Sequence, residues 1–275
     1  MTTGPQDPVR VQLTAICDRL LPAEAITPEQ RQELLAQLEQ VLLSAKLEAL
    51  AEFAAGAGHE INNPVATIAG RAQLLTAGET NPERRHALEI IGGQALRIRD
   101  MIGDVMLFAR PPIPRVARHA LLELVTQAVA SQAELKRRHS AVVTIEVAAD
   151  ATIDADRTQL LVVLSSLLRN SLEAASQPGI QVRVSARDEV RNDVAGIIVA
   201  VQDNGPGLSE SAREHAFDPF FSGRQAGRGL GFGLSKCWRI LQLHAGDIQF
   251  RPIVPGTIIE TWWPYKDSQL PTGAQ

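Results

Sequence analysis

The strongest constraint on the fold is a long series of apolar residues at the spacing of one face of an α-helix. Steps of three and four residues connect Leu50, Ala54, Ala57, Ile61, Val65, Ile68, Ala72 and Leu75. After the turn at Gly78–Pro82, a second series follows at Leu88, Ile91, Ala95, Ile98, Ile102 and Val105. Two such helices carry more apolar surface than one hairpin can bury. We therefore expect a homodimer in which two hairpins form a four-helix bundle; the alternative is packing of the hairpin on the second domain of the same chain.

His59 lies off this apolar face, so its side chain is expected to point into solvent or towards a partner. An exposed imidazole is largely neutral near neutral pH, and the neutral ring is a nucleophile. Glu60 can accept a proton from one ring nitrogen and so activate the other. Asn63, one turn later on the same face, can hold a water or a phosphoryl oxygen beside the ring. The plainer interpretation of any single histidine of this kind is a surface residue without a function.

The second half of the chain contains two glycine-containing segments that favour a nucleotide site. Asp203 follows the apolar run Ile197–Val201 and precedes Gly205 and Gly207. A carboxylate there can accept a hydrogen bond from an exocyclic amine, and glycines let the backbone approach a flat base. The later segment Gly227–Leu234 precedes an expected helix, whose first N–H groups would face phosphate oxygens. The second segment alone is weak evidence for a phosphate site, but its order after the first makes the pattern more specific.

Together these segments resemble the sensor histidine kinases of two-component signalling. Five motifs occur in the order of that family: His59–Pro64 resembles the H box, Asn170–Ala174 the N box, Asp203–Leu208 the G1 box, Phe217–Phe221 the F box and Gly227–Gly233 the G2 box. The resemblance extends from Leu47 to Trp262. It implies an α+β fold: a helical hairpin dimerisation domain, which forms a four-helix bundle in the dimer, followed by a two-layer α/β sandwich that binds ATP.

The resemblance also implies catalytic and binding roles. His59 attacks the γ-phosphate of ATP, Glu60 assists its deprotonation, and Asn63 supports a phosphatase reaction as well. Asn170 binds the Mg²⁺ ion that bridges the phosphates. Phe217, Phe220 and Phe221 anchor a lid over ATP. The expected ATP-binding residues are Asn170, Asp203, Gly205, Gly207, Arg224, Arg228, Gly229 and Gly231. Arg224 or Arg228 would bind the γ-phosphate through its guanidinium group, or else both belong to a solvated basic loop.

Ser166 departs from the pattern of the family. It lies one turn before Asn170, where related water-hydrolysing ATPases carry a catalytic glutamate. The lack of a carboxylate disfavours direct hydrolysis of ATP and favours transfer to His59. It also keeps open an alternative function, a dimeric signalling scaffold that binds nucleotide without kinase activity.

Prolines and composition divide the chain into parts. We expect an N-terminal input or partner-docking segment at 1–27, phosphotransfer helices at 28–110, a proline-rich linker at 111–114, a catalytic ATP-binding domain at 115–264 and a polar tail at 265–275. Thr27–Gln30 is a capping box that begins a helix running to Gly78. The short helix expected at Val9–Leu21 is too small for a usual sensor domain, which indicates that a partner protein delivers the signal there.

Beyond the linker, the pattern predicts alternating helices and strands. Helices are expected at 119–138, at 157–175 and up to Leu243, and strands at 142–147, 152–154, 180–186, 197–202, 248–250 and 257–262. Mixed elements in this order suit a two-layer α+β domain.

Composition narrows the range of partners. The 275-residue chain has a net charge of −4 and lacks a basic stripe with interleaved aromatic residues, which argues against nucleic-acid binding. It contains neither a signal-peptide pattern nor an apolar stretch of membrane-spanning length, so we expect a cytoplasmic protein. Cys17 and Cys237 do not have metal-type spacing. The family resemblance adds ATP and Mg²⁺ as cofactors and the receiver domain of a response regulator as the phosphoryl acceptor.

Overall fold

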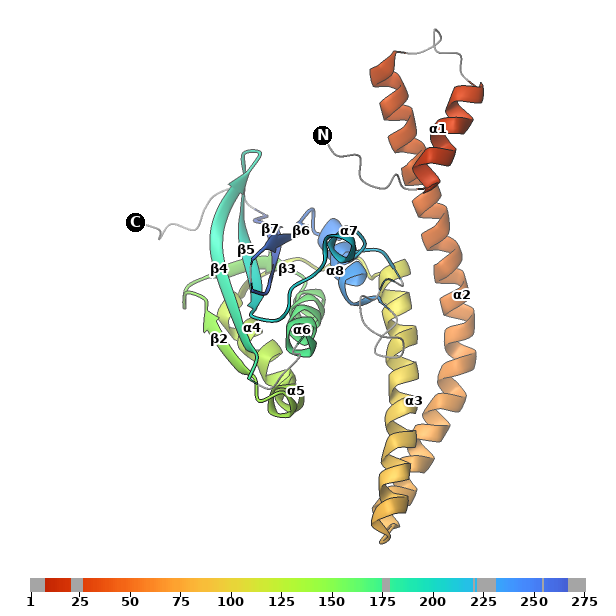
Figure 1. Ribbon diagram of the computed structural model, residues 1–275, viewed down its shortest axis with the longest axis vertical. Helices are drawn as coiled ribbons and strands as arrows, with labels where there is room; N and C mark the ends of the chain where they lie inside the picture. The colour runs from red at the N-terminus through yellow and green to blue at the C-terminus, as the bar shows by residue number, and fades with distance from the viewer. Residues whose placement is uncertain are drawn as a thin grey trace. The chain divides into compact units, whose positions relative to one another are not determined.

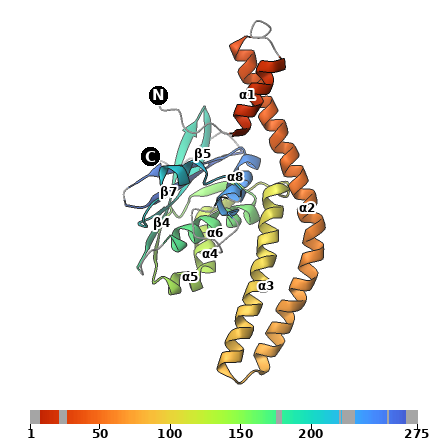
Figure 2. The same cartoon turned by 45° about the vertical axis from the view of Figure 1, so that its right-hand side comes forward.

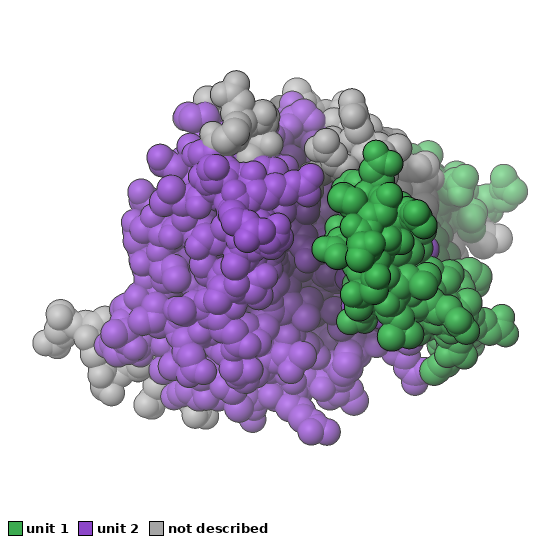
Figure 3. Space-filling view, turned by 90° about the horizontal axis from the view of Figure 1, so that it is seen from below, with its two compact units in different colours: residues 1–96 green, residues 97–275 purple. Residues whose placement is uncertain are grey.

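The structure is a computed structural model that describes residues 8–20, 27–174, 179–219, 221, 231–253 and 255–266. Figure 1 and Figure 2 show its helices and strands in two orientations. The chain divides into two compact units, residues 1–96 and residues 97–275 (Figure 3). Among the helices of the described ranges, none is long and apolar enough to cross a membrane.

The first unit is helical in its described residues. Helix α1 spans Pro8–Leu20, α2 spans Pro28–Gly78, and α3, which spans Pro82–Ala109, begins here (Figure 1). Thr27 caps α2 as expected: its hydroxyl accepts the N–H of Gln30 at 3.3 Å, and the Gln30 side chain accepts the N–H of Thr27 at 2.9 Å. Helix α2 is continuous through Pro64. Its expected extent is therefore confirmed.

The second unit contains a two-layer α+β domain. Its strands are β1 (Ala117–Ala120), β2 (Val142–Glu146), β3 (Thr152–Ala155), β4 (Gln181–Arg191), β5 (Val194–Asp203), β6 (Asp247–Pro252) and β7 (Thr257–Pro264). The main sheet has the order β2-β4-β5-β7-β6, with β2 parallel to β4 and the other neighbours antiparallel. Strands β1 and β3 form a separate antiparallel pair. The two-layer fold expected from the family resemblance is confirmed.

Helices cover one face of the main sheet (Figure 2). Those that contact its strands are α4 (Leu121–Ser131), α6 (Arg157–Glu173) and α8 (Gly233–Leu243). The two short helices of this unit are α5 (Ala133–Arg138), which packs against α6, and α7 (Glu210–Glu214). The central helix, α6, buries Leu160, Leu164 and Leu167 in the core, where strand residues such as Val184 and Val199 are also fully buried. Burial of these apolar side chains is the main force that joins the layers.

The helix expected at 119–138 is wrong in its bounds. Its first two residues, 119 and 120, belong instead to strand β1, which pairs with β3. Arg118 of β1 also donates two hydrogen bonds, of 2.9 and 2.8 Å, to the carboxylate of Asp154 on β3. The remaining residues form two helices that are separated at Gln132, whose φ and ψ are −97° and 16°. Tertiary pairing therefore overrides the local helical pattern here.

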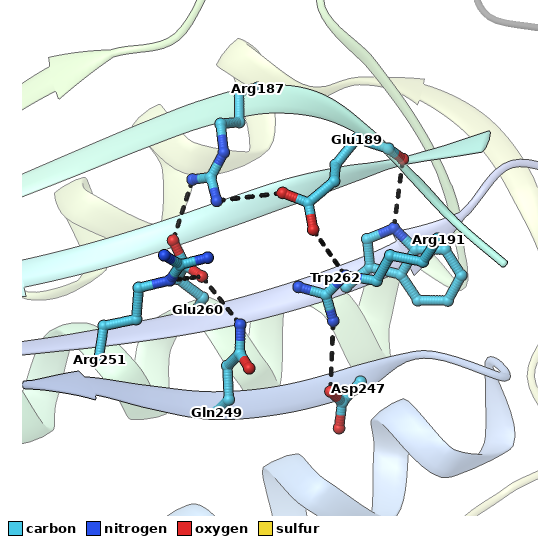
Figure 4. Close-up of polar contacts among 8 residues, drawn as sticks. All are labelled: Arg187, Glu189, Arg191, Asp247, Gln249, Arg251, Glu260 and Trp262. Atoms are coloured by element: carbon cyan, nitrogen blue, oxygen red, sulfur yellow. Dashed lines mark hydrogen bonds and ion pairs between the residues drawn. The ribbon is translucent and has the colours of Figure 1, made fainter. Parts of the chain in front are cut away.

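Strands β4 and β5 extend beyond their apolar stretches because they pair with each other from the Val182–Asp203 pair to the Arg191–Val194 pair. Long polar side chains cover the outer face of the sheet (Figure 4). At the centre of this face, Glu260 is 4% exposed and accepts hydrogen bonds from Arg187 at 3.0 Å and Arg251 at 2.5 Å. Burial alone would raise the pKa of Glu260, but these bonds lower it. The guanidinium of Arg191 lies 5.5 Å from the ring centre of Trp262. This face is thus closed by its own side chains.

Candidate functional site

The predicted phosphoacceptor residues lie together on one face of α2. His59, Glu60 and Asn63 are all exposed, and His59 and Asn63 are one helical turn apart. Pro64 lacks an N–H group, so it does not donate to the carbonyl of Glu60 as a helical residue would. The hydroxyl of Thr67 donates to the carbonyl of Asn63 at 3.0 Å. The arrangement presents an accessible imidazole with a carboxylate and an amide beside it.

The second predicted group surrounds Asp203, the last residue of β5. Its carboxylate is 4% exposed, and this burial raises its pKa, although the backbone N–H of Gly205, at 3.0 Å from Oδ1, acts in the opposite direction. A Cβ atom at position 205 would lie 2.9 Å from the same oxygen. The absence of a Cβ at Gly205 thus leaves room for the close approach of the loop to the carboxylate. The hydroxyl of Ser171 and the N–H of Thr257 are further hydrogen-bond donors to this carboxylate.

The loop after Asp203 is held by a residue that the sequence analysis missed. Asn204 accepts the N–H of Gln181 through its side-chain oxygen at 2.9 Å, and its own N–H reaches the carbonyl of Gln181 at 3.2 Å. These two bonds attach the loop to the start of β4. An asparagine between Asp203 and Gly205 is visible in the sequence, but its partner on another strand is not.

Gly256, in the turn between β6 and β7, is a second residue that the sequence analysis missed. It has φ +115°, and a Cβ there would overlap the carbonyl oxygen of Asp203 and lie 3.2 Å from the Cα of Asn204. Gly207 has φ +77°, and a Cβ there would lie 3.0 Å from the carbonyl oxygen of Gly256. The two glycines thus allow the β6–β7 turn to pack directly against the backbone of the Asp203 loop.

Helix α6 carries Asn170 near its C-terminal end. Asn170 is half-buried, and the next residue, Ser171, is 1% exposed; its hydroxyl opposes the rise in the pKa of Asp203 that burial causes. In the described part of the chain, no group of three or more His, Cys, Asp or Glu side chains could hold a metal ion. An Mg²⁺ ion that is shared with phosphate oxygens and waters needs few protein ligands, and an amide oxygen is a suitable one. The donor chemistry of Asn170 therefore fits the expected ion.

The glycine-rich segment ends at the start of α8. Gly231 has φ +75°, and the cap residue Phe232 makes no side-chain hydrogen bond to the first N–H groups of the helix. Phe232 is 2% exposed, and its ring centre lies 5.6 Å from that of Phe108. Arg224, Arg228 and Gly229 lie outside the described residues, as does Phe220. Their predicted roles stay predictions.

Ser166 packs against a buried thiol. Cys237 of α8 is completely buried, which raises the pKa of its thiol to about 12, and its Sγ lies 3.1 Å from the carbonyl oxygen of Gly233. The hydroxyl of Ser166 is a hydrogen-bond partner of this thiol. The serine thus contributes to the contact between α6 and α8, and the thiol is chemically inert at neutral pH.

The other ends of α6 and α8 are joined by His244. Its Nε2 accepts the N–H of Asp156 at 3.0 Å, and its Nδ1 lies 2.9 Å from the carbonyl oxygen of Ile240. Burial lowers the pKa of His244, so the ring is neutral and carries its proton on Nδ1. Asp156 in turn caps α6 by accepting the N–H groups of Thr158 and Gln159.

We expect the protein to lose stability on acidification because of His244. The pKa of this residue in the folded state is below the unfolded value of 6.5, so the unfolded chain binds more protons between these two values. The free energy of unfolding should therefore fall as the pH decreases from about 6.5 towards the folded pKa. Urea unfolding at about pH 7.5 and about pH 5.5 measures this difference. The variant His244→Gln should show a smaller difference in the free energy of unfolding between the two pH values. The control His86→Gln, at an exposed histidine, should show the same difference as the native chain. Equal pH dependence in both variants would contradict the assignment of this effect to His244.

We expect the variant Asp203→Asn to bind ATP about 10- to 100-fold more weakly. The amide replaces a charged acceptor, and a hydrogen bond to a charged group contributes about 1.5–3 kcal/mol. Titration calorimetry with ATP measures the affinity. The control is Asp154→Asn, which alters another buried carboxylate, 5% exposed, whose bonds go to Arg118 and to the N–H of Lys266. Equal ATP affinity of the Asp203 variant and the native chain would exclude Asp203 from the nucleotide site.

Comparison with known proteins identifies the two parts of the chain. Residues 49–112 match the His Kinase A (phospho-acceptor) domain, and residues 155–267 match the histidine kinase-, DNA gyrase B-, and HSP90-like ATPase family. The first match contains His59, and the second contains Asn170 and Asp203. Fold and site thus define a phosphoacceptor hairpin that is joined to an ATPase domain. The chain belongs to the sensor histidine kinases.

In the curated relatives, the region that matches this chain is part of a much longer protein. The chain is 31% identical to the C4-dicarboxylate transport sensor protein DctB of Pseudomonas aeruginosa, over 80% of this chain and 36% of that protein. It is 30% identical to the signal transduction histidine-protein kinase AtoS of Escherichia coli, over 74% of this chain and 33% of that protein. The chain therefore spans about a third of the length of these relatives.

Solved structures of histidine kinases have a similar fold. Full-length ShkA in complex with AMPPNP aligns with a TM-score of 0.62 at 21% identity, over 78% of this chain and 45% of that chain. The histidine kinase ThkA, solved in complex with the response regulator protein TrrA, aligns with a TM-score of 0.55 at 21% identity, over 94% of this chain and 68% of that chain. These likenesses concern the fold.

Proposed function

We propose that the protein is an ATP-dependent histidine kinase that phosphorylates itself on His59 and passes the phosphoryl group to an aspartate of a response regulator. The observation that carries this proposal is the presence, in one chain, of an exposed histidine with Glu60 and Asn63 on its helix face and of a buried carboxylate, Asp203, in a glycine-bounded loop. The family matches support the same activity.

In the first step, a ring nitrogen of His59 attacks the γ-phosphorus of ATP. A nitrogen–phosphorus bond forms, the bond between the γ-phosphorus and its bridging oxygen breaks, and ADP leaves. Glu60 accepts the proton from the other ring nitrogen, which keeps electron density at the attacking atom. In the second step, a carboxylate oxygen of the response regulator attacks the same phosphorus and releases the histidine. Asn63, on the same face, orients a phosphoryl oxygen or, in the phosphatase reaction, the water that hydrolyses the phosphorylated aspartate of the regulator.

Nucleotide binding is assigned to the second unit. The Asp203 carboxylate accepts a hydrogen bond from the exocyclic amine of adenine, and Gly205 and Gly207 let the backbone approach the base. Asn170 would hold an Mg²⁺ ion, which neutralises charge on the phosphates. The backbone at Gly229 and Gly231 and the guanidinium groups of Arg224 and Arg228 are the proposed phosphate ligands.

We assign the dimer contact to the hairpin of the first unit. Several large apolar side chains of α2 and α3 are exposed in a single chain, among them Leu74 at 77%, Leu75 at 60% and Ile90 at 51%. Exposed apolar side chains of this number are typical of an interface, and a second hairpin of the same sequence would cover them in a four-helix bundle. Helix α1 and the start of α2 are the proposed docking site for an upstream partner protein.

The test is incubation of the purified full chain with Mg²⁺ and γ-labelled ATP, followed by acid and alkali treatment of the protein. A phosphohistidine is labile in acid and stable in alkali. Label with this behaviour is the expected result. Binding of ATP without label would favour the nucleotide-binding scaffold, and release of phosphate without labelled protein would favour a plain ATPase.

A further inference from the structure

The proline-rich linker after α3 is bonded to the N-terminal end of α6. Nε2 of Gln159 donates to the carbonyl of Pro112 at 2.7 Å, and the N–H of Arg115 donates to Oδ2 of Asp156 at 2.9 Å. We call these two bonds the linker clasp. Both lie within the second unit, which begins at Arg97 and so also contains the end of α3, where Asp104 pairs with Lys236 of α8 at 2.5 Å. The clasp bonds residues 112–115 to the ATP-binding domain.

The burial of Gln159 indicates that its bond to the linker matters. The side chain is 4% exposed, and among the described residues its Oε1 has no hydrogen-bond partner. Burial of an amide costs free energy unless hydrogen bonds replace those to water. An apolar residue would fill this position on α6 at lower cost. What the glutamine adds is the bond to Pro112.

Little free chain remains between α3 and the clasp. Helical hydrogen bonding continues to Arg110, whose N–H donates to the carbonyl of Met106 at 2.8 Å. Pro111 is then the single residue between this last helical bond and the clasp. Three prolines, at 111, 112 and 114, restrict φ along the segment. Chain that is bonded and restricted in this way cannot act as a long flexible tether.

The clasp is supported from the opposite side by α8. The carboxylate of Asp156 accepts the N–H of Arg115 in the linker, and the N–H of Asp156 donates to His244 at the end of α8. Hydrogen bonds to Thr158 and Gln159 hold the other carboxylate oxygen of Asp156. The linker is therefore bonded directly to the start of α6, the helix that carries Asn170, and indirectly, through Asp156, to the end of α8.

We propose that Gln159 is a positioning residue for phosphoryl transfer: by clasping the linker to α6 it limits the chain that can bend between the last helical bond of α3 and α6 to Arg110 and Pro111. This inference rests on the proposed kinase activity. A shorter and more restricted tether raises the effective concentration of bound ATP at the phosphoacceptor and limits its orientations. Release of the clasp lengthens the free chain to residue 115 or beyond. It should slow transfer without changing the affinity for ATP.

The test compares Gln159→Leu with Gln132→Leu in the full chain. Leucine has nearly the size of glutamine and lacks its donor. Gln132 is a matched control, because it is also buried in the second unit, at 7% exposure, but its Nε2 donates locally to Ser131 at 2.9 Å. The measurements are the initial rate of labelling at saturating ATP, the KM for ATP and the hydrogen exchange of the Arg115 amide.

For Gln159→Leu we expect a labelling rate about three- to tenfold lower, an unchanged KM for ATP and faster exchange at Arg115, with none of these changes in Gln132→Leu. A native labelling rate in Gln159→Leu, or a rate that falls together with the ATP affinity, would overturn the proposal. So would the same loss of rate in both variants. If the native chain is not labelled at all, the kinase assignment fails, whereas unchanged exchange at Arg115 would show by itself that the clasp is wrong.

Discussion

Replacement of His59 by glutamine should abolish self-phosphorylation while leaving the affinity for ATP unchanged. Glutamine is polar and similar in length, so it can occupy the exposed position on α2 without disturbing the helix, but its amide is not a nucleophile. Loss of a residue that forms the covalent intermediate lowers a rate by on the order of a thousandfold or more. The measurement is incorporation of label from γ-labelled ATP, with nucleotide affinity determined on the same sample.

The control for this variant is His86→Gln on α3. His86 is also an exposed helical histidine, with 75% of its side chain accessible, but it does not lie in the H-box pattern. The variant His86→Gln should incorporate as much label as the native chain. Label that persists in His59→Gln and disappears in His86→Gln would place the phosphoacceptor on α3 and would refute its assignment to His59.

Substitution of Gly256 by alanine should destabilise the ATP-binding domain by about 3–5 kcal/mol, enough to unfold many domains. Two costs add: a non-glycine residue is strained at φ +115°, and the new Cβ overlaps the carbonyl oxygen of Asp203. The atoms that must move are backbone, so the clash cannot be relieved by rotation of a side chain. Urea unfolding of the native chain and the variant measures the change.

Gly179→Ala separates the two costs. Gly179 also has a positive φ, of +94°, but a Cβ there would meet nothing within 4 Å. Its variant should therefore lose about 1–2 kcal/mol from backbone strain alone. Equal losses at positions 179 and 256 would show that the close approach of the β6–β7 turn to Asp203 is not maintained in solution.

The parts of the fold that the sequence predicts well are those that depend on near neighbours. The capping box at Thr27 and the exposed face that contains His59 and Asn63 follow from helical geometry, in which residues one turn apart share a face. The end of α2 at Gly78 follows from the composition of the turn after it. Such features need no knowledge of what else packs nearby.

Features that depend on distant pairing were missed or misjudged. Residues 119 and 120 of strand β1 were expected to be helical, because the pairing of β1 with β3 and the Arg118–Asp154 contact are not visible locally. The role of Gly256 depends on the pairing of β7 with β5, which brings the preceding turn to Asp203. The Pro255–Gly256 pair signals a turn. Nothing in the sequence says what that turn touches.

The burial of both cysteines makes the native chain a convenient background for spectroscopic labelling. Cys17 is 3% exposed and Cys237 is fully buried, and they are the two cysteines of the sequence. A thiol-reactive dye should therefore attach selectively to a cysteine introduced on the surface. Ile113, in the middle of the linker, is 90% exposed and is a suitable position for one. A fluorophore there would report directly, through its rotational freedom, whether nucleotide changes the hold of α6 on the linker.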